Sequence, residues 1–300
     1  MQEPLKMLVL ANPRAGGGRV FRKLRHIEKW FHETGQQVEI SIPDGRDETI
    51  RMAREAKSNG FDVVIAMGGD GTSKDTLAGA TGTGIKFGLI PAGRGNDTAR
   101  NLGYPQDLEM IVRGFKNPVI RKMDVPTVNG HIFTNSSGVG FDSAVVQLTT
   151  NGRCKMPGSL CYFYAVYRAV LTFKPISMRV TIDDKVYEGK YTMCLASNGE
   201  HFGGGMKIVP GAILDDGMMD ICLLENISAL KLMTVFPSVY KGKHVTLPEV
   251  TLLRGKKIVI ESDKPAPVDF DGDLIGLTPA VIEVGKHTIE VLVPDYPRNE

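Results

Sequence analysis

The sequence is short of the features that mark membrane-spanning, secreted and nucleic-acid-binding proteins. Its four cysteines have no Cys-x-x-Cys spacing, which favours buried thiols in a reducing compartment. The 36 basic and 34 acidic residues nearly balance, which argues against bulk binding to nucleic acid. The most membrane-like stretch, 161–173, is too short to span a bilayer. We therefore expect a cytoplasmic protein with no signal peptide and no transmembrane segment.

Glycine is plentiful, and it gathers in loops that follow short apolar segments. In Val63–Thr72 a β-branched run, typical of a buried strand, ends in three glycines around Asp70, and a helix is expected over 74–79. Free N–H groups and the helix dipole would point at such a loop, which is how helix N-termini bind anions. An ordinary tight turn is the alternative. It leaves Asp70 unexplained, because a carboxylate repels a phosphate unless a cation lies between them.

Two further strands end in the same way. The apolar segment 8–11 runs into Asn12–Arg19, and the segment 87–90 runs into Pro91–Thr98. Strand-end glycine loops of one α/β sheet are expected to converge on one crevice. None of the loops has the spacing of a P-loop or of the dinucleotide fingerprint, so neither of those folds is predicted.

The three motifs together resemble a known family. In order and spacing, Asn-Pro-x-x-Gly, Gly-Gly-Asp-Gly-Thr and Pro-x-Gly-x-x-Asn-Asp are similar to the catalytic domain of the diacylglycerol kinases, a family that includes bacterial lipid kinases and the sphingosine and ceramide kinases. Gly-Gly-Asp-Gly alone also resembles NAD kinases and phosphofructokinases. The resemblance implies an ATP- and Mg²⁺-dependent lipid kinase that phosphorylates a lipid hydroxyl at the membrane surface. Diacylglycerol is the expected acceptor and phosphatidic acid the product, and relatives are commonly homodimers.

The pattern of strands and helices divides the chain in two. Alternating strands and helices through residue 102 predict an α/β nucleotide-binding domain over 1–117. Short alternating strands then predict a mainly antiparallel β-sandwich domain for the lipid substrate over 118–300, with helices near 160–171 and 229–240. The resemblance implies that the end of the chain returns to the first domain. The strands expected in the second domain are Val119–Val125, Ile132–Asn135, Met178–Ile182, Tyr187–Ser197, Met219–Leu224, Ile258–Glu261, Val281–Val284 and Thr288–Val293.

For the nucleotide side, the resemblance implies a water-mediated Mg²⁺ network of three aspartates, although Asp124 also reads as a buried structural carboxylate. Arg94 stands where the family has threonine or serine, and it would either clamp a phosphate or point to solvent. Lys74-Asp75 replaces the family's Asn-Glu. The residues assigned to this site are Asn12, Ser41, Gly68, Gly69, Asp70, Gly71, Thr72, Arg94, Gly95, Asn96, Asp97 and Asp124.

Two segments of the second domain resemble further family motifs. Asn135–Asp142 is similar to a motif near the family's cleft, although it also reads as a turn with an Asx cap. The spacing of Asp215-Asp216-Gly217 predicts a hairpin turn. The resemblance instead implies a structural Mg²⁺ on Asp216, beside Asp215, with backbone ligands from Ile213 and Met218.

The segment Val268–Asp273 alternates three carboxylates, which would lie on one side of an extended strand and raise one another's pKa. The resemblance implies that an acid here deprotonates the lipid hydroxyl. We expect Asp271 to be the base and place Asp273, which stands where the family has glutamate, second. A solvated acidic turn is the alternative.

Two groups of residues are candidates for contact with the lipid, and each allows two interpretations. An apolar stretch would either contact acyl chains or belong to the core, and a basic cluster would either meet anionic headgroups or be solvated. The stretch comprises Met156, Phe163, Tyr164, Tyr167, Leu171 and Phe173, and the cluster comprises Lys241, Lys243, His244, Arg254, Lys256 and Lys257. The alternatives to a diacylglycerol kinase are a kinase for another lipid or an NAD-like acceptor, and a non-catalytic nucleotide-binding regulator.

Overall fold

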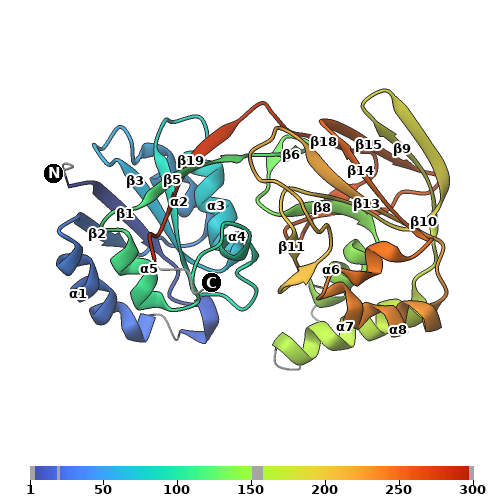
Figure 1. Cartoon of the computed structure of the whole chain (residues 1–300), viewed down its shortest axis with the longest axis horizontal. Coiled ribbons are helices and arrows are strands. Elements are labelled where there is room, and N and C mark those ends of the chain that lie inside the picture. The colour runs from blue at the N-terminus through green and yellow to red at the C-terminus, as the bar shows by residue number, and fades with distance from the viewer. Residues whose placement is uncertain (1–3, 19–20, 151–157, 297–300) are drawn as a thin grey trace. The chain divides into compact units, whose positions relative to one another are not determined.

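A computed structural model describes residues 4–18, 21–150 and 158–296 and divides the chain into two compact units (Figure 1). Unit 1 runs to Val125 and resumes at Lys286, and unit 2 is Pro126–Gly285. The domain boundary predicted from the sequence, between residues 117 and 118, lies directly before β5 (Val119–Asp124), a strand that belongs to unit 1.

Unit 1 is built on a six-stranded sheet with the order β2-β1-β3-β4-β19-β5. The first four strands are parallel, β19 pairs with β4 in parallel, and β5 runs antiparallel to β19. Every residue of β3 is buried, as its continuous apolar run predicted. The strands are β1 (Lys6–Ala11), β2 (Gln37–Ser41), β3 (Val63–Gly68), β4 (Lys86–Pro91), β5 (Val119–Asp124) and β19 (Thr288–Val293).

Helices cover both faces of this sheet. The step from β1 to β2 runs opposite to the steps from β2 to β3 and β3 to β4, so right-handed crossovers place α1 on one face and α2 and α3 on the other (Figure 1). This reversal makes the carboxyl ends of β1 and β3 a topological switch point, where open α/β sheets bind ligands. The helices are α1 (Leu24–Thr34), α2 (Arg46–Glu55), α3 (Asp70–Ala80), α4 (Asp97–Asn101) and α5 (Leu108–Gly114).

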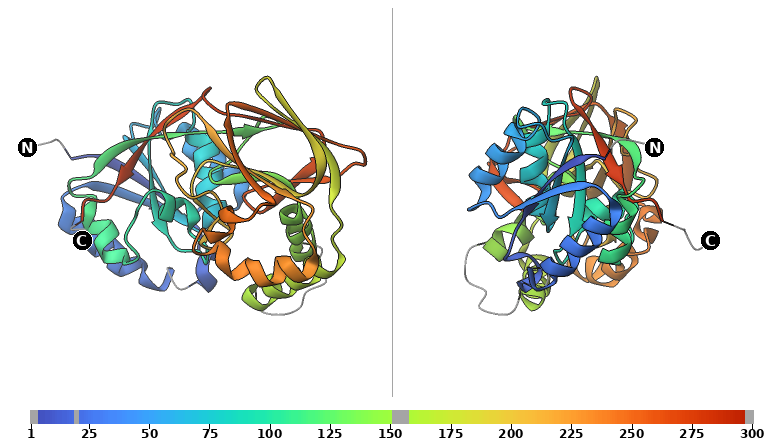
Figure 2. Two further views of the ribbon diagram at one scale, coloured as in Figure 1. Left: turned by 45° about the vertical axis from the view of Figure 1, so that its right-hand side comes forward. Right: turned by 90° about the vertical axis from the view of Figure 1, so that its left-hand side faces the viewer.

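Unit 2 is a mainly antiparallel β-sandwich whose longest strand joins its two parts. Residues 185–191 of β10 pair with β9, whereas residues 193–197 lie between β8 and β13. The left view of Figure 2 follows β9 and β10 as a long yellow hairpin. The strands are β6 (Thr127–Val128), β7 (His131–Ile132), β8 (Ser136–Gly140), β9 (Ile176–Ile182), β10 (Lys185–Ser197), β11 (His201–Phe202), β12 (Met206–Lys207), β13 (Met219–Glu225), β14 (Val250–Gly255), β15 (Lys257–Ser262), β16 (Pro267–Phe270), β17 (Asp273–Leu277) and β18 (Ala280–Glu283).

The helices of unit 2 are α6 (Phe141–Thr150), α7 (Gly158–Thr172) and α8 (Ala229–Val239), and they pack on β10 and β13 through one apolar cluster. A second apolar cluster fills the space between the strands. None of the described helices is long and apolar enough to cross a membrane.

The predicted fold class, an α/β domain followed by a mainly antiparallel β-sandwich, is confirmed. Two details were wrong. The strand 119–125 was expected in the sandwich, but β5 lies in the sheet of unit 1, because alternation predicts a strand and not the sheet it joins. The return of the chain end to the first domain, which the family resemblance implied, is confirmed, since β19 lies in the same sheet. For the segment 135–142 a turn with an Asx cap was one of two interpretations, and this one was wrong, because the segment forms β8 and the start of α6.

Candidate active site

The three glycine loops of unit 1 close against one another at the carboxyl edge of its sheet, as their positions predicted. The side-chain amide of Asn12 donates to the hydroxyl of Thr72 at 3.0 Å. A Cβ atom on Gly93 would lie 2.6 Å from the Cα atom of Gly69, and a Cβ atom on Gly16 would collide with the carbonyl oxygen of Ala92. Only glycine allows the backbones to approach so closely. The three loops therefore meet beside the N-terminus of α3.

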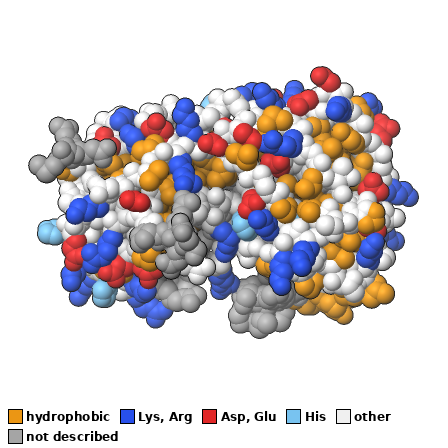
Figure 3. All heavy atoms as spheres, in the orientation of Figure 1, with side chains coloured by type: hydrophobic (Ala, Val, Ile, Leu, Met, Phe, Trp, Pro, Cys, Tyr) orange, Lys and Arg blue, Asp and Glu red, His pale blue; other side chains and the backbone are white. Residues whose placement is uncertain are grey.

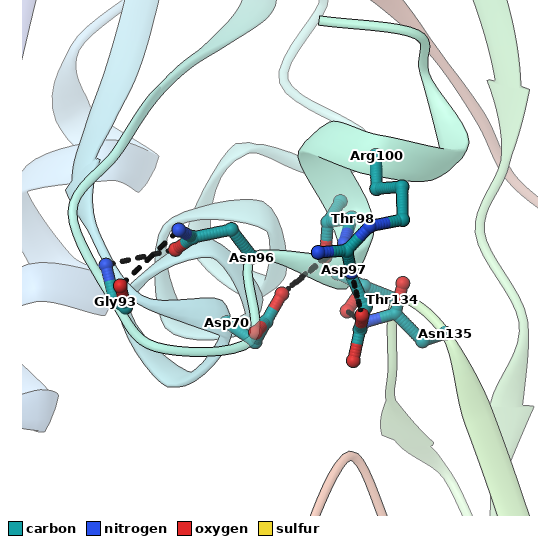
Figure 4. Close-up of polar contacts among 8 residues, drawn as sticks. All are labelled: Asp70, Gly93, Asn96, Asp97, Thr98, Arg100, Thr134 and Asn135. Carbon is teal, nitrogen blue, oxygen red and sulfur yellow. Dashed lines mark hydrogen bonds and ion pairs between the residues drawn. The ribbon is translucent and has the colours of Figure 1, made fainter. Parts of the chain in front are cut away.

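Asp70 is the first residue of α3 and is linked to the third loop (Figure 4). Its Oδ1 accepts hydrogen bonds from the backbone N–H and the hydroxyl of Thr98, at 3.1 and 3.3 Å. Burial, and then the negative charge of Asp97, raise the pKa of Asp70. Asp97 forms an ion pair with Arg100. Neither Thr98 nor Arg100 was expected from the motifs, which do not show which groups face the carboxylates.

The remaining residues assigned to the nucleotide side have separate surroundings. Asn96 has a positive φ of 54°, and its side chain exchanges hydrogen bonds of 2.8 and 3.2 Å with the backbone of Gly93, so it fixes the loop that contains Gly95 (Figure 4). Arg94 is exposed. Asp124 is buried at the end of β5, and Ser41 is half-buried at the end of β2.

Unit 1 has the chemistry to hold a divalent cation together with a phosphate. Asp70 and Asp97 lie in each other's electrostatic field, which a bound cation would relieve. Among the residues that the structure describes, no three acidic, histidine or cysteine side chains form a metal cluster. Mg²⁺ is usually bound by one or two carboxylates, substrate phosphates and water. Asp70, with Asp97 beside it, therefore fits Mg²⁺ that arrives with a nucleotide, and Asp97 would be shared between this ion and Arg100.

In unit 2, Asp271 occupies a turn and not an extended strand. Asp271 and Gly272 both have positive φ, 46° and 83°, as in a two-residue type I′ turn between β16 and β17. The expectation that 269, 271 and 273 share one side of a strand was therefore wrong. Asp271 accepts hydrogen bonds from the N–H and hydroxyl of Thr134, at 2.6 and 2.8 Å, and from the N–H groups of Asn135 and Ser136, at 2.8 and 3.1 Å.

These four donors occupy the acceptor positions of an ionised carboxylate, which has about four. Asp271 therefore anchors the β16–β17 turn to the segment that leads into β8. Asp273, at the start of β17, is exposed.

Behind this turn, two aspartates are buried together. Asp269 is 0% exposed and Asp142, the second residue of α6, is 5% exposed. The Ser143 hydroxyl donates to Asp269 Oδ1 at 2.8 Å. Burial raises the pKa of Asp142 to about 6, and burial together with the charge of Asp142 raises that of Asp269 well above its usual range. Burial therefore favours the protonated form of this pair.

The loop expected to hold a structural Mg²⁺ has other contacts. Asp216 Oδ1 accepts a hydrogen bond from Met218 N–H at 3.0 Å, and its Oδ2 accepts one from the guanidinium of Arg254. Asp215 and Ile213 are exposed. The positive charge beside the Asp216 carboxylate is thus supplied by the guanidinium of Arg254, at the position that a metal ion would otherwise take. The residues here do not fit a metal site, and the hairpin-turn interpretation describes Asp216 better.

The two candidate lipid-contact groups are only partly at the surface. Tyr164, Tyr167 and Leu171 are exposed on α7, and Figure 3 shows apolar side chains over α7 and α8 at the lower right. Phe173 packs against the apolar cluster beneath these helices. Met156 and the side chain of Phe163 lie outside what the structure describes.

The basic cluster does not act as one surface. His244 is buried with Nε2 2.9 Å from the carbonyl oxygen of Ile208, and burial lowers its pKa. Arg254 is paired with acidic residues of unit 2. The prediction of a basic cluster was wrong for these two members, because sequence proximity does not show which charges are already neutralised.

Comparison with known proteins places both units in one family. The description "Diacylglycerol kinase catalytic domain" matches residues 6–128, and "YegS C-terminal NAD kinase beta sandwich-like domain" matches residues 135–293. A protein named diacylglycerol kinase from Mycobacterium tuberculosis is 30% identical over 97% of this chain and 96% of its own length. One from Bacillus subtilis is 26% identical over 95% of each.

Solved structures agree on the fold. A crystal structure of a diacylglycerol kinase from Bacillus anthracis has a TM-score of 0.76 at 22% identity and covers 98% of both chains. A second crystal structure from the same strain has a TM-score of 0.80 at 24% identity, with the same coverage.

Proposed function

The chain belongs to the diacylglycerol kinase family, and from this premise we propose that it transfers the γ-phosphate of ATP to the hydroxyl of diacylglycerol, giving phosphatidic acid. Relatives named diacylglycerol kinase align along nearly the whole chain, which supports a kinase that phosphorylates an alcohol. Because the acceptor is a membrane lipid, the reaction would take place at a membrane surface.

One observation carries the donor half of the proposal: three glycine loops close against one another around Asp70 at the N-terminus of an eleven-residue helix. Backbone N–H groups and the positive end of the helix dipole favour phosphate oxygens. We assign phosphate binding to Gly68, Gly69, Gly71 and Thr72, with Asn12 beside them through its hydrogen bond to Thr72. Ser41 would line the nucleoside side.

Asp70 and Asp97 are the residues proposed to hold Mg²⁺, with Asp124 at the end of β5 as a partner through water. Bound Mg²⁺ supplies positive charge that neutralises the transferring phosphoryl group. Thr98 orients Asp70 through two hydrogen bonds, and Asn96 holds the adjoining loop, so the carboxylate meets its ligand without first having to reorganise.

For the acceptor half, we propose Asp273 as the general base and Asp271 as the residue that positions it. This reverses the order expected from the sequence. Asp271 already accepts four hydrogen bonds, so taking a proton would break at least one of them. Asp273 is exposed and lies directly after the turn that Asp271 anchors. A base must be within reach of the hydroxyl that it deprotonates, which favours the exposed carboxylate.

The test is phosphoryl transfer from γ-labelled ATP to lipid vesicles, with the labelled product identified after extraction. Vesicles with diacylglycerol, ceramide or monoacylglycerol, and NAD in solution, are compared with and without Mg²⁺. We expect labelled phosphatidic acid from diacylglycerol alone, and only with Mg²⁺. Label on another acceptor would correct the substrate. ATP binding without transfer to any acceptor would indicate a nucleotide-binding regulator and refute the proposed enzyme.

A further inference from the structure

The segment that joins β12 to β13 in unit 2 contacts one arginine from a neighbouring strand. Arg254 lies on β14 directly opposite Asp220 of β13. Its Nε is 2.9 Å from Asp220 Oδ1, and its Nη2 donates to Asp216 Oδ2. One guanidinium therefore contacts two carboxylates, one on the loop and one on the strand that follows it.

Both carboxylates also accept hydrogen bonds from backbone N–H groups of the same loop. Met218 N–H donates to Asp216 at 3.0 Å, and the backbone of Ile213 hydrogen-bonds Asp220. Asp220 is 8% exposed, so its negative charge needs a positive partner. Burial raises the pKa of Asp220 and the charge of Arg254 opposes this effect. The partners of Asp216 and of Asp220 Oδ1 are thus nitrogen donors, while Asp220 Oδ2 is buried without a hydrogen-bond partner among the described residues.

We propose that the guanidinium of Arg254 holds the 211–218 loop on β13 and β14 in the place where the family resemblance implies a divalent cation. The fold of unit 2 is then independent of metal. If the chain acts as the proposed kinase, its requirement for Mg²⁺ comes from the nucleotide site of unit 1 alone.

The proposal makes a specific prediction for Arg254→Ala. Removing the guanidinium leaves Asp216 and Asp220 facing each other without a cation, which is the arrangement that binds Ca²⁺ or Mg²⁺. We expect the variant to lose stability in the presence of EDTA and to regain part of it in millimolar Ca²⁺ or Mg²⁺, because an ion that binds only the native state stabilises it.

The experiment is calorimetric unfolding of the full chain without nucleotide or lipid, so its outcome does not depend on whether the proposed kinase activity is correct. Trp30, the only tryptophan, lies on α1 of unit 1, and its fluorescence distinguishes the unfolding of that unit from the transition of unit 2. Arg179→Ala is the matched control, because Arg179 forms an exposed 3.6 Å ion pair with Glu188 in the same unit.

We expect the wild-type Tm to be the same in EDTA, Mg²⁺ and Ca²⁺. Arg254→Ala should lower the Tm of unit 2 by roughly 3–8 °C, between the effects of losing an exposed and a buried ion pair, because Asp220 is buried and the Arg254 side chain is 45% exposed. The metal-dependent gain should vanish in Arg254→Ala combined with Asp216→Asn, and Arg179→Ala should change little.

A wild-type Tm that falls in EDTA and recovers with metal would overturn the proposal, as would an Arg254→Ala variant as stable as the wild type or one that does not respond to metal. If Arg254→Ala does not fold, Arg254→Lys provides the test. Lysine keeps the positive charge but lacks the planar guanidinium that contacts both carboxylates, so the variant should lose less stability than Arg254→Ala and should not respond to chelation.

Discussion

The buried pair of Asp142 and Asp269 predicts a pH dependence that one substitution should remove. Asp142 lies at the start of α6 with its carboxylate among buried groups of unit 2. Burial raises its pKa from 3.8 to about 6. The native state therefore holds a proton on Asp142 over a range of pH in which the unfolded chain has already released it.

The sign follows from this difference in bound protons. Between pH 4 and pH 6 the folded state binds more protons than the unfolded state, so the free energy of unfolding falls as pH rises. The pKa change from 3.8 to about 6 corresponds to about 3 kcal/mol of stability, present below pH 4 and lost above pH 6. Asn at this position cannot ionise, and its side-chain oxygen still accepts hydrogen bonds. Asp142→Asn should therefore match the wild type near pH 4 and exceed it by about 3 kcal/mol at pH 8.

The assay is calorimetric unfolding of both proteins at a series of pH values from 4 to 8. For a unit of this size the expected difference at pH 8 is roughly 6–12 °C in the Tm of unit 2. Asp184→Asn is the control, because Asp184 is exposed in the β9–β10 turn and should leave the pH profile unchanged. Parallel pH profiles for the wild type and Asp142→Asn would refute the assignment of this titration to the buried pair.

Three further outcomes follow from the candidate site. Asp70→Asn should lower lipid phosphorylation by roughly 10²–10³-fold without lowering the Tm of unit 1, because one ligand of the proposed cation is lost. The control variant Asp47→Asn, at an exposed position, should keep wild-type activity. Wild-type turnover by Asp70→Asn would exclude Asp70 from the site. Asp273→Asn should lower kcat by roughly 10²–10⁴-fold at unchanged Tm, whereas Asp271→Asn should chiefly lower the Tm of unit 2; the opposite pattern would return the base to Asp271. Arg94→Ser should raise the KM for ATP if Arg94 clamps a phosphate, and an unchanged KM would place this exposed side chain in solvent.

The sequence predicts those parts of the fold that depend on local pattern. The buried strands β1, β3 and β4, the loops that follow them and the helices α7 and α8 all appear where apolar periodicity and glycine placed them. The convergence of the loops was also predictable, because parallel strands of one sheet end at one edge.

Other features depend on contacts between distant parts of the chain and leave no local signal. A turn with an Asx cap was one interpretation of 135–142, yet this segment is flanked by β10 and β16 on either side and forms β8. The partner strands are residues 185–197 and 267–270, far away in sequence. Likewise, alternating apolar residues in 119–124 indicate a strand, but only its pairing with β19 shows that this strand belongs to unit 1. The place of 288–293 in unit 1 was expected from the family resemblance and not from its local pattern.

The aspartates show most clearly why residue type alone does not assign a role. Asp70 lies near another carboxylate and is suited to a cation. Asp142 belongs to a pair that keeps a proton, Asp216 is neutralised by Arg254, and Asp271 accepts four hydrogen bonds. In each case the group that determines the role of the carboxylate is remote in sequence. The charges and hydrogen-bond donors that the fold places beside a carboxylate determine whether it binds a metal, holds a proton, forms an ion pair or anchors a turn. A base for the lipid hydroxyl must be able to reach that hydroxyl, so it is sought among exposed carboxylates and not among those that anchor a turn. On that criterion Asp273 is a better candidate than Asp271.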